Sequence, residues 1–145
     1  MACYEFSGPR SFESAEVAHV FRATGNFHDA ILDEIEVEAG AFRFLIFRPY
    51  FPHLRTYGTE GFRHARITLV PDGDVASETR DELSRLRDED ILGLRVRSDR
   101  PELEIMLTHS IAESVSIVEC VIPFNPREST FEWMPDGEAG PRGPA

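Results

Sequence analysis

The chain has 145 residues, with 26 acidic side chains against 15 arginines and no lysine, so its formal net charge is −11. This acidity argues against nucleic acids and anionic membrane surfaces as partners, because both are bound by clustered cations. No apolar run approaches the ~18 residues that a membrane-spanning helix needs. The charge is compatible with a basic partner, which an acidic surface attracts over distance, and equally with a plain role in solubility.

The composition, 41% hydrophobic, is that of an ordinary globular protein, and the length predicts one domain. The segment from Met1 to Glu5 lacks the features of a secretory signal, which predicts a cytoplasmic protein. The two cysteines, Cys3 and Cys120, do not make a disulfide framework. With no glycine-rich nucleotide loop and no metal-ligand motif, we expect neither a cofactor nor a bound metal.

The first part of the chain predicts a helix followed by a pair of strands. Residues 14–23 carry apolar side chains at helical spacing, with Gly25 as a candidate stop, although a strand fits nearly as well. Ile35 and Val37 then alternate with glutamates, as in a half-exposed strand. After a tight turn, residues 41–48 are apolar on both faces, which predicts a strand in the middle of a sheet.

A long connection over residues 48–64 contains four aromatic residues among prolines and glycines: Tyr50, Phe51, Tyr57 and Phe62. Loops of this length are often functional. The four aromatic side chains either fold back over an open face of the sheet, which we favour, or line a cleft for a small ligand.

The rest of the chain predicts further strands and a second helix. A strand over 65–70 precedes the charged segment 77–88, whose thin apolar stripe predicts a surface helix or a charged loop with helical tendency. Strands follow over 92–96, 103–107 and 115–122, and their short connections imply antiparallel neighbours.

Together these elements predict an α+β fold: an antiparallel sheet of about six strands with one or two helices packed on one face. Residues 1–124 would form the domain. Proline and glycine dominate from residue 125 onward, so 125–145 is predicted to be a mostly unstructured tail. Its Trp133, the only tryptophan, could still dock on the body.

The pair His28-Asp29 invites a catalytic interpretation, because a histidine beside a carboxylate can act as a general base. Neighbouring residues in an extended chain point to opposite faces, so Asp29 is not expected to orient His28. We favour a structural role, in which Asp29 caps the backbone at Ala30 or Ile31 and His28 fixes the strand entrance by a hydrogen bond. A catalytic site would require one histidine to meet a carboxylate in a cleft, the candidates being His28, His53, His64 and His109.

Four acidic residues form what we call the acidic ridge: Asp33, Glu34, Glu36 and Glu38. Its three glutamates lie on one face of a predicted strand, where like charges repel. Either Arg43 on the next strand compensates for them, which is slightly favoured, or the acidic ridge binds an external basic surface.

The segment Gly25-Asn26-Phe27-His28-Asp29, followed by a strand, a short turn and a second apolar strand, resembles small bacterial proteins that carry an "FHD" segment. The later strand with Val118-Glu119-Cys120-Val121 is similar to that layout in order and spacing. Several such families are immunity proteins encoded beside polymorphic toxins. The resemblance implies a non-enzymatic protein that binds and neutralises a cognate toxin, which we expect to be basic and to engage the acidic ridge.

Overall fold

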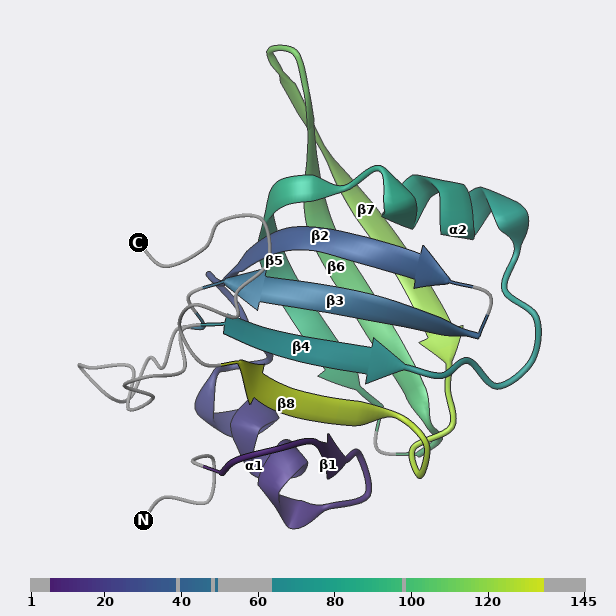
Figure 1. The fold of residues 1–145 in the computed structure, drawn as a ribbon. Helices are drawn as coiled ribbons and strands as arrows, with labels where there is room; N and C mark the ends of the chain where they lie inside the picture. Colours follow the sequence, from purple (N-terminus) through teal and green to yellow (C-terminus); the bar gives the residue numbers. More distant parts are fainter. Residues whose placement is uncertain (1–5, 39, 48, 50–63, 98, 135–145) are drawn as a thin grey trace.

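The computed structural model describes residues 6–38, 40–47, 49, 64–97 and 99–134. These residues form an α+β fold with one antiparallel sheet of eight strands and two helices (Figure 1). The strands lie side by side in the order β1-β8-β4-β3-β2-β5-β6-β7. In chain order the elements are β1 (Arg10–Ser11), α1 (Ala15–Ala23), β2 (Ile31–Glu38), β3 (Ala41–Phe47), β4 (His64–Leu69), α2 (Ser77–Ser84), β5 (Arg87–Val96), β6 (Glu102–Ile111), β7 (Ser114–Pro123) and β8 (Thr130–Met134).

Strand β3 lies inside the sheet, between β2 and β4, as its two-sided apolar pattern predicts. Phe42, Phe44 and Ile46 point into the core and are fully buried. Leu45 and Phe47, on the opposite face, are also buried, with 8% and 5% of their surface exposed. A strand that is covered on both faces has no polar side to present, which explains its continuous apolar run.

Strand β5 joins the two halves of the sheet. Its first residues pair with β2, with Arg87 opposite Glu34, whereas residues from Ile91 onward pair with β6 alone. The sheet therefore folds over, and β5, β6 and β7 cross behind β2, β3 and β4 (Figure 1). Both halves contribute to one core, which includes Leu32, Ile35, Phe42, Phe44, Ile46, Ile67, Leu94, Leu103, Ile105, Leu107 and Phe131.

The two helices flank this folded sheet at opposite sides (Figure 1). Helix α1 begins after Ser14, whose hydroxyl accepts a hydrogen bond from the Val17 amide at 3.3 Å, a standard N-cap. This confirms the predicted helix over 14–23. Helix α2 packs against β2, and buries Leu83. Neither helix of the described chain has the length and the apolar stretch that crossing a membrane requires.

All six predicted strands are present, as β2 to β7, and two more were missed. Strand β1 has only two residues, and β8 lies within the segment that was predicted to be a tail. β8 pairs with β4 and β1 and buries Phe131 and Trp133 in the core. The tail and domain boundary at 124/125 were therefore wrong up to Met134, because burying two large aromatic side chains outweighs the local abundance of proline and glycine. Residues 135–145 lie outside the described chain.

Strand β5 also begins earlier than predicted, at Arg87, through a run of charged residues. Glu89 in this run is 4% exposed and accepts hydrogen bonds from the Thr108 hydroxyl at 2.9 Å and from the amide and hydroxyl of Ser110 at 2.8 and 3.1 Å. These bonds satisfy a carboxylate that would otherwise be costly to bury. They tie the start of β5 to the part of β6 near its turn into β7, and the end of this hairpin projects beyond the body of the protein (Figure 1).

The reactivity of the Cys120 thiol on β7 tests whether this side chain is buried beside α2. Burial raises its pKa to about 11 from 9.0, and the carboxylate of Glu82 on α2 adds to the shift. The thiolate is the reactive form, so at pH 8 we expect a Cys3→Ser variant to react with a disulfide reagent about 100-fold more slowly than an exposed cysteine. The neutral thiol stabilises the fold below pH 9 or so, and this contribution is lost as the pH rises through about 11.

The thiol prediction is checked by following the reaction rate of the Cys3→Ser variant between pH 7 and pH 11, with unfolded protein as the reference. Substituting Glu82→Gln removes a nearby negative charge and is expected to lower the pKa of Cys120 and raise the rate. A rate equal to that of the unfolded chain would contradict the buried placement.

Candidate partner-binding surface

The "FHD" segment forms a left-handed turn directly after α1. Gly25, Asn26, Phe27 and Asp29 have φ angles of 60°, 59°, 62° and 70°. Residues other than glycine rarely adopt this backbone conformation, because their Cβ atom approaches the following carbonyl oxygen. Such strain persists only where the surrounding structure over-determines it, and it is concentrated at functional sites.

Burial of Phe27 holds the turn in this conformation. Its ring is fully buried and packs edge-on against Phe21 at 5.1 Å between ring centroids, and beside Phe131 at 5.9 Å. The hydroxyl of Thr24 donates to the carbonyl of Val20 at 2.8 Å and accepts from the Phe27 amide at 3.2 Å. A large apolar side chain is thus fixed in the core, and the next two residues are presented to solvent.

The turn is also fastened to β5 by hydrogen bonds. The Leu94 amide donates to the carbonyl of Asn26 at 2.8 Å, and the Asp29 amide donates to the carbonyl of Ile91 at 3.1 Å. Nδ1 of His28 lies 2.9 Å from the carbonyl oxygen of Leu92, the residue at which the β5–β6 register shifts. A carbonyl oxygen only accepts, so Nδ1 carries the proton and donates to it.

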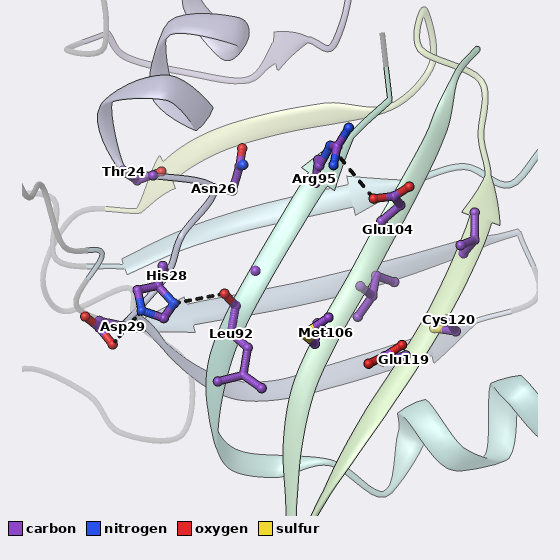
Figure 2. A pocket seen from close by; sticks show the side chains of 14 residues that line it. Thr24, Asn26, His28, Asp29, Leu92, Arg95, Glu104, Met106, Glu119 and Cys120 are labelled. Atoms are coloured by element: carbon purple, nitrogen blue, oxygen red, sulfur yellow. Dashed lines mark hydrogen bonds and ion pairs between the residues drawn. The ribbon is translucent and has the colours of Figure 1, made fainter. Parts of the chain in front are cut away.

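His28 and Asp29 do not point apart, and the expectation that they would was wrong. His28 Nε2 lies 3.5 Å from Asp29 Oδ1 (Figure 2). The backbone is not extended here, because Asp29 has a left-handed φ that brings its side chain alongside the ring. The carboxylate therefore faces His28, and the Ala30 amide donates to the carbonyl of Phe27 at 3.1 Å rather than to Asp29.

A hollow of about 880 Å³ opens between this turn and the outer face of β5, β6 and β7 (Figure 2). Gly93 lies on its floor, opposite Met106. A Cβ at Gly93 would meet nothing within 4 Å, and the residue has no left-handed φ. Glycine is therefore not required by the backbone there, and its effect is to leave the space open. At the rim, Arg95 pairs with Glu104 at 3.8 Å.

Exposed apolar side chains gather on the same strands. Every large hydrophobic residue that is exposed in the described chain lies on β5, β6 or β7: Val96, Met106, Ile111, Val115, Ile117 and Val121. In the β6–β7 ladder Glu104 is opposite Val121, Met106 is opposite Glu119, and Thr108 is opposite Ile117. Residues opposite each other share a face of the sheet. Met106, Val115, Ile117 and Val121 thus lie on the outer face with the hollow, and we call this face the β5–β7 surface.

The acidic ridge is less continuous than its sequence indicates. The β2–β3 register skips Asp33, which lies at a bulge between Leu32 and Glu34 and is only 3% exposed. Its Oδ2 lies 3.8 Å from Nε2 of the buried His64. Asp33 is therefore not on the same exposed surface as Glu36, because an extra residue in one strand breaks the two-residue alternation.

The remaining glutamates of the acidic ridge are largely neutralised. Glu34 forms an ion pair with Arg87, and Glu38 forms one with Arg43. Arg43 compensates as expected, although the residue directly opposite it is Glu36. Glu36 is exposed and has no ion pair within the described residues. The charge compensation weighs against the acidic ridge as the main contact surface.

The other predicted site residues are dispersed or lie outside the described chain. The aromatic residues Tyr50, Phe51, Tyr57 and Phe62, together with His53, fall in 50–63, which the structure does not describe. His64 is buried and stacks at 4.6 Å on the ring of Phe47. His109 is on β6, away from the residues that line the hollow.

At this hollow His28 meets a carboxylate, that of Asp29. Its Nδ1–H is bonded to a backbone carbonyl and its Nε2 faces Asp29, so neither ring nitrogen is directed at the floor of the hollow. Among the described residues no three metal-ligating side chains converge. The arrangement places the exposed side chains of His28 and Asp29 beside an open hollow.

Sequence reasoning missed the hollow, since its lining comes from the turn and three separate strands. One signal was available, the glycine in the middle of the alternating strand around Gly93, because glycine in a strand often marks a close approach or an open site. Comparison with protein-family models, with curated proteins and with solved structures gives no match for this chain.

Proposed function

We propose that this protein is a non-enzymatic binding protein that captures a basic protein partner on the β5–β7 surface. The observation that carries the proposal is the grouping of four exposed large apolar side chains, Met106, Val115, Ile117 and Val121, on the face of these strands that also bears the hollow. Exposed apolar patches rimmed by polar residues mark interaction sites. An apolar centre within a polar rim is also the usual anatomy of a protein interface.

Charge supports a basic partner. The formal net charge is −11, so the electrostatic field of the whole molecule attracts a cationic protein and repels an anionic one. Complementary charge accelerates association and discriminates against wrong partners more than it adds affinity. The net negative charge of the molecule, to which the exposed Glu36 contributes, would then steer the partner from a distance while the β5–β7 surface makes the contact.

The resemblance of the "FHD" segment to immunity proteins supports a more specific form of the proposal, in which the partner is a toxin that the protein neutralises. An inhibitor of this kind works by covering a surface of its target, so it needs a rigid docking face and no catalytic group. The strained turn at residues 25–29, fixed by the burial of Phe27, supplies such rigidity at the edge of the hollow.

The test compares two variants that change the net charge equally. Ile117→Arg introduces a charge on the β5–β7 surface, and Glu36→Gln removes one from the acidic ridge. Tagged full-length protein is used to capture partners from its source organism at low and high salt. We expect a stoichiometric basic protein with wild type, at least ~10-fold weaker binding with Ile117→Arg, because it disrupts a contact, and at most ~2-fold weaker binding with Glu36→Gln, because it only alters steering.

Toxin neutralisation is checked with the captured protein itself. Its expression alone should arrest growth, and co-expression with wild type or Glu36→Gln should restore growth, whereas Ile117→Arg should not. The proposal fails if no basic protein is captured. The assignment of the contact to the β5–β7 surface fails if Glu36→Gln weakens binding as much as Ile117→Arg does. That result would mean that the acidic ridge makes the contact.

A further inference from the structure

Strand β7 is an edge strand without the usual protection. It lies at one end of the sheet and, within the described chain, pairs only with β6. It is ten residues long, and its ladder with β6 runs from Ser114 to Pro123 without a register shift. It carries no lysine or arginine, and its only proline is the last residue. Natural proteins normally blunt an exposed edge with such residues or with bulges, because the free backbone groups recruit another strand.

The outer face of β7 presents exposed aliphatic side chains and one glutamate that an added strand could contact. Val115, Ile117 and Val121 are 66%, 58% and 49% exposed, and Glu119 stands between the last two. Glu119 is exposed and has no ion pair with any residue that the structure describes. Figure 2 places Glu119 on β7 at the edge of the hollow, close to Met106, the residue directly opposite it in the ladder.

Charge decides between a second copy of this chain and a different protein as the occupant. Residues 114–123 contain no basic side chain, so pairing two β7 strands would place Glu119 opposite an aliphatic residue or another carboxylate in any antiparallel register that keeps the faces aligned. Like charges directly opposite each other destabilise a sheet. The net charge of −11 on each copy adds to the repulsion. A strand that carries a cation opposite Glu119 has neither cost.

We infer that the partner adds one strand to the edge of β7, with a basic side chain opposite Glu119 and aliphatic side chains opposite Val115, Ile117 and Val121. This inference rests on the proposed function and specifies its binding mode. In strand addition the main-chain hydrogen bonds supply affinity, and alternate side chains supply specificity. The added strand runs antiparallel to β7, as every other neighbour in this sheet does. Its basic side chain then reaches the rim of the hollow, where Glu119 lies.

The probe is a short capped peptide in which valine, arginine, isoleucine and valine, in that order, alternate with threonine. This order matches Val121, Glu119, Ile117 and Val115 in antiparallel register. A second peptide has glutamate in place of arginine. Binding to full-length, isotope-labelled protein is followed by amide chemical shifts. We expect shifts along β7 and an affinity about fivefold higher for the arginine peptide, the effect of a cross-strand ion pair worth about 1 kcal/mol.

Two further comparisons separate strand addition from contact through side chains alone. The charge-swapped variant Glu119→Arg should reverse the preference and bind the glutamate peptide better. The arginine peptide is also N-methylated at every second residue, in the two possible sets. Only the set whose N–H groups face β7 should abolish binding, since alternate residues of a strand direct their N–H groups to opposite edges.

The inference is overturned if both N-methylated peptides bind like the parent, if Glu119→Arg leaves the preference unchanged, or if no shift occurs at millimolar peptide. It is also overturned if sedimentation of the free protein reveals a dimer that Ile117→Lys dissociates, because the occupant would then be a second copy. These results are independent of the proposed function. Capture of a basic protein that Ile117→Arg releases, without any peptide binding to β7, would leave the function standing and reject only the strand addition.

Discussion

Replacing Phe27 by alanine is expected to lower the free energy of unfolding by about 3–5 kcal/mol, because a fully buried aromatic ring is lost. Replacing it by glycine is expected to cost about 1 kcal/mol less than alanine. Phe27 has a φ of 62°, a conformation that penalises any side chain with a Cβ and that glycine adopts freely. Urea unfolding of the two variants measures the difference directly.

Phe21 supplies the matched control, since it is also buried but lies within α1. In a helix, glycine is less favourable than alanine by about 1 kcal/mol. The order of stability should therefore invert between the two sites, with glycine above alanine at 27 and below it at 21. If the glycine variant were less stable than the alanine variant at both sites, the left-handed turn would carry no strain. The turn would then not supply rigidity at the edge of the hollow.

Removing β8 is expected to abolish cooperative folding. A chain that ends at Glu128 lacks Phe131 and Trp133, each of which contributes about 3–5 kcal/mol by burial. The combined loss is comparable to the roughly 5–15 kcal/mol that stabilises an ordinary domain. It also exposes the edges of β4 and β1, which β8 joins. Circular dichroism during thermal unfolding would reveal the loss as a broad, non-cooperative transition.

Phe131→Ala is a milder form of the same test and should cost about 3–5 kcal/mol. The ring of Phe131 packs against Phe6, Phe27 and Trp133, with centroid distances of 6.1, 5.9 and 4.9 Å. Removing the ring would therefore destabilise the turn that contains Phe27 as well as the sheet. Glu128→Ala, at an exposed position just before β8, serves as the control and should change stability by less than about 0.5 kcal/mol. A sharp transition in the truncated chain would mean that β8 is not integral to the sheet.

Much of the fold was predictable because burial leaves a periodic trace in the sequence. The alternation around Ile35 and Val37 and the continuous run of β3 specify the β2–β3 pair. Short connections specify the antiparallel order of β5, β6 and β7. The β8 strand was missed because its Phe131-Glu132-Trp133 alternation is short and lies in a proline- and glycine-rich stretch, so local composition outweighed the periodicity.

The candidate site was predictable only in part, because irregular backbone removes the periodicity on which such reasoning depends. The segment around His28 was singled out, yet its left-handed turn, which brings Asp29 alongside the ring, follows from the burial of Phe27 by distant residues. One bulge moves Asp33 away from the acidic ridge. The hollow depends on the turn at residues 25–29 lying beside β5, and strand addition depends on the edge of β7 staying open, and neither is encoded in a local pattern.

The place of β8 in the sheet has a consequence for how the protein is made. β8 is the last strand of the described chain, and it lies between β4 and β1, which emerge from the ribosome much earlier. The N-terminal elements therefore cannot complete their core until Met134 has left the exit tunnel. Contacts so distant in sequence slow the search for the native state. Completion of the sheet thus waits for β8, and apolar segments that β8 covers stay exposed in the nascent chain until it arrives, a stage at which chaperones protect such chains.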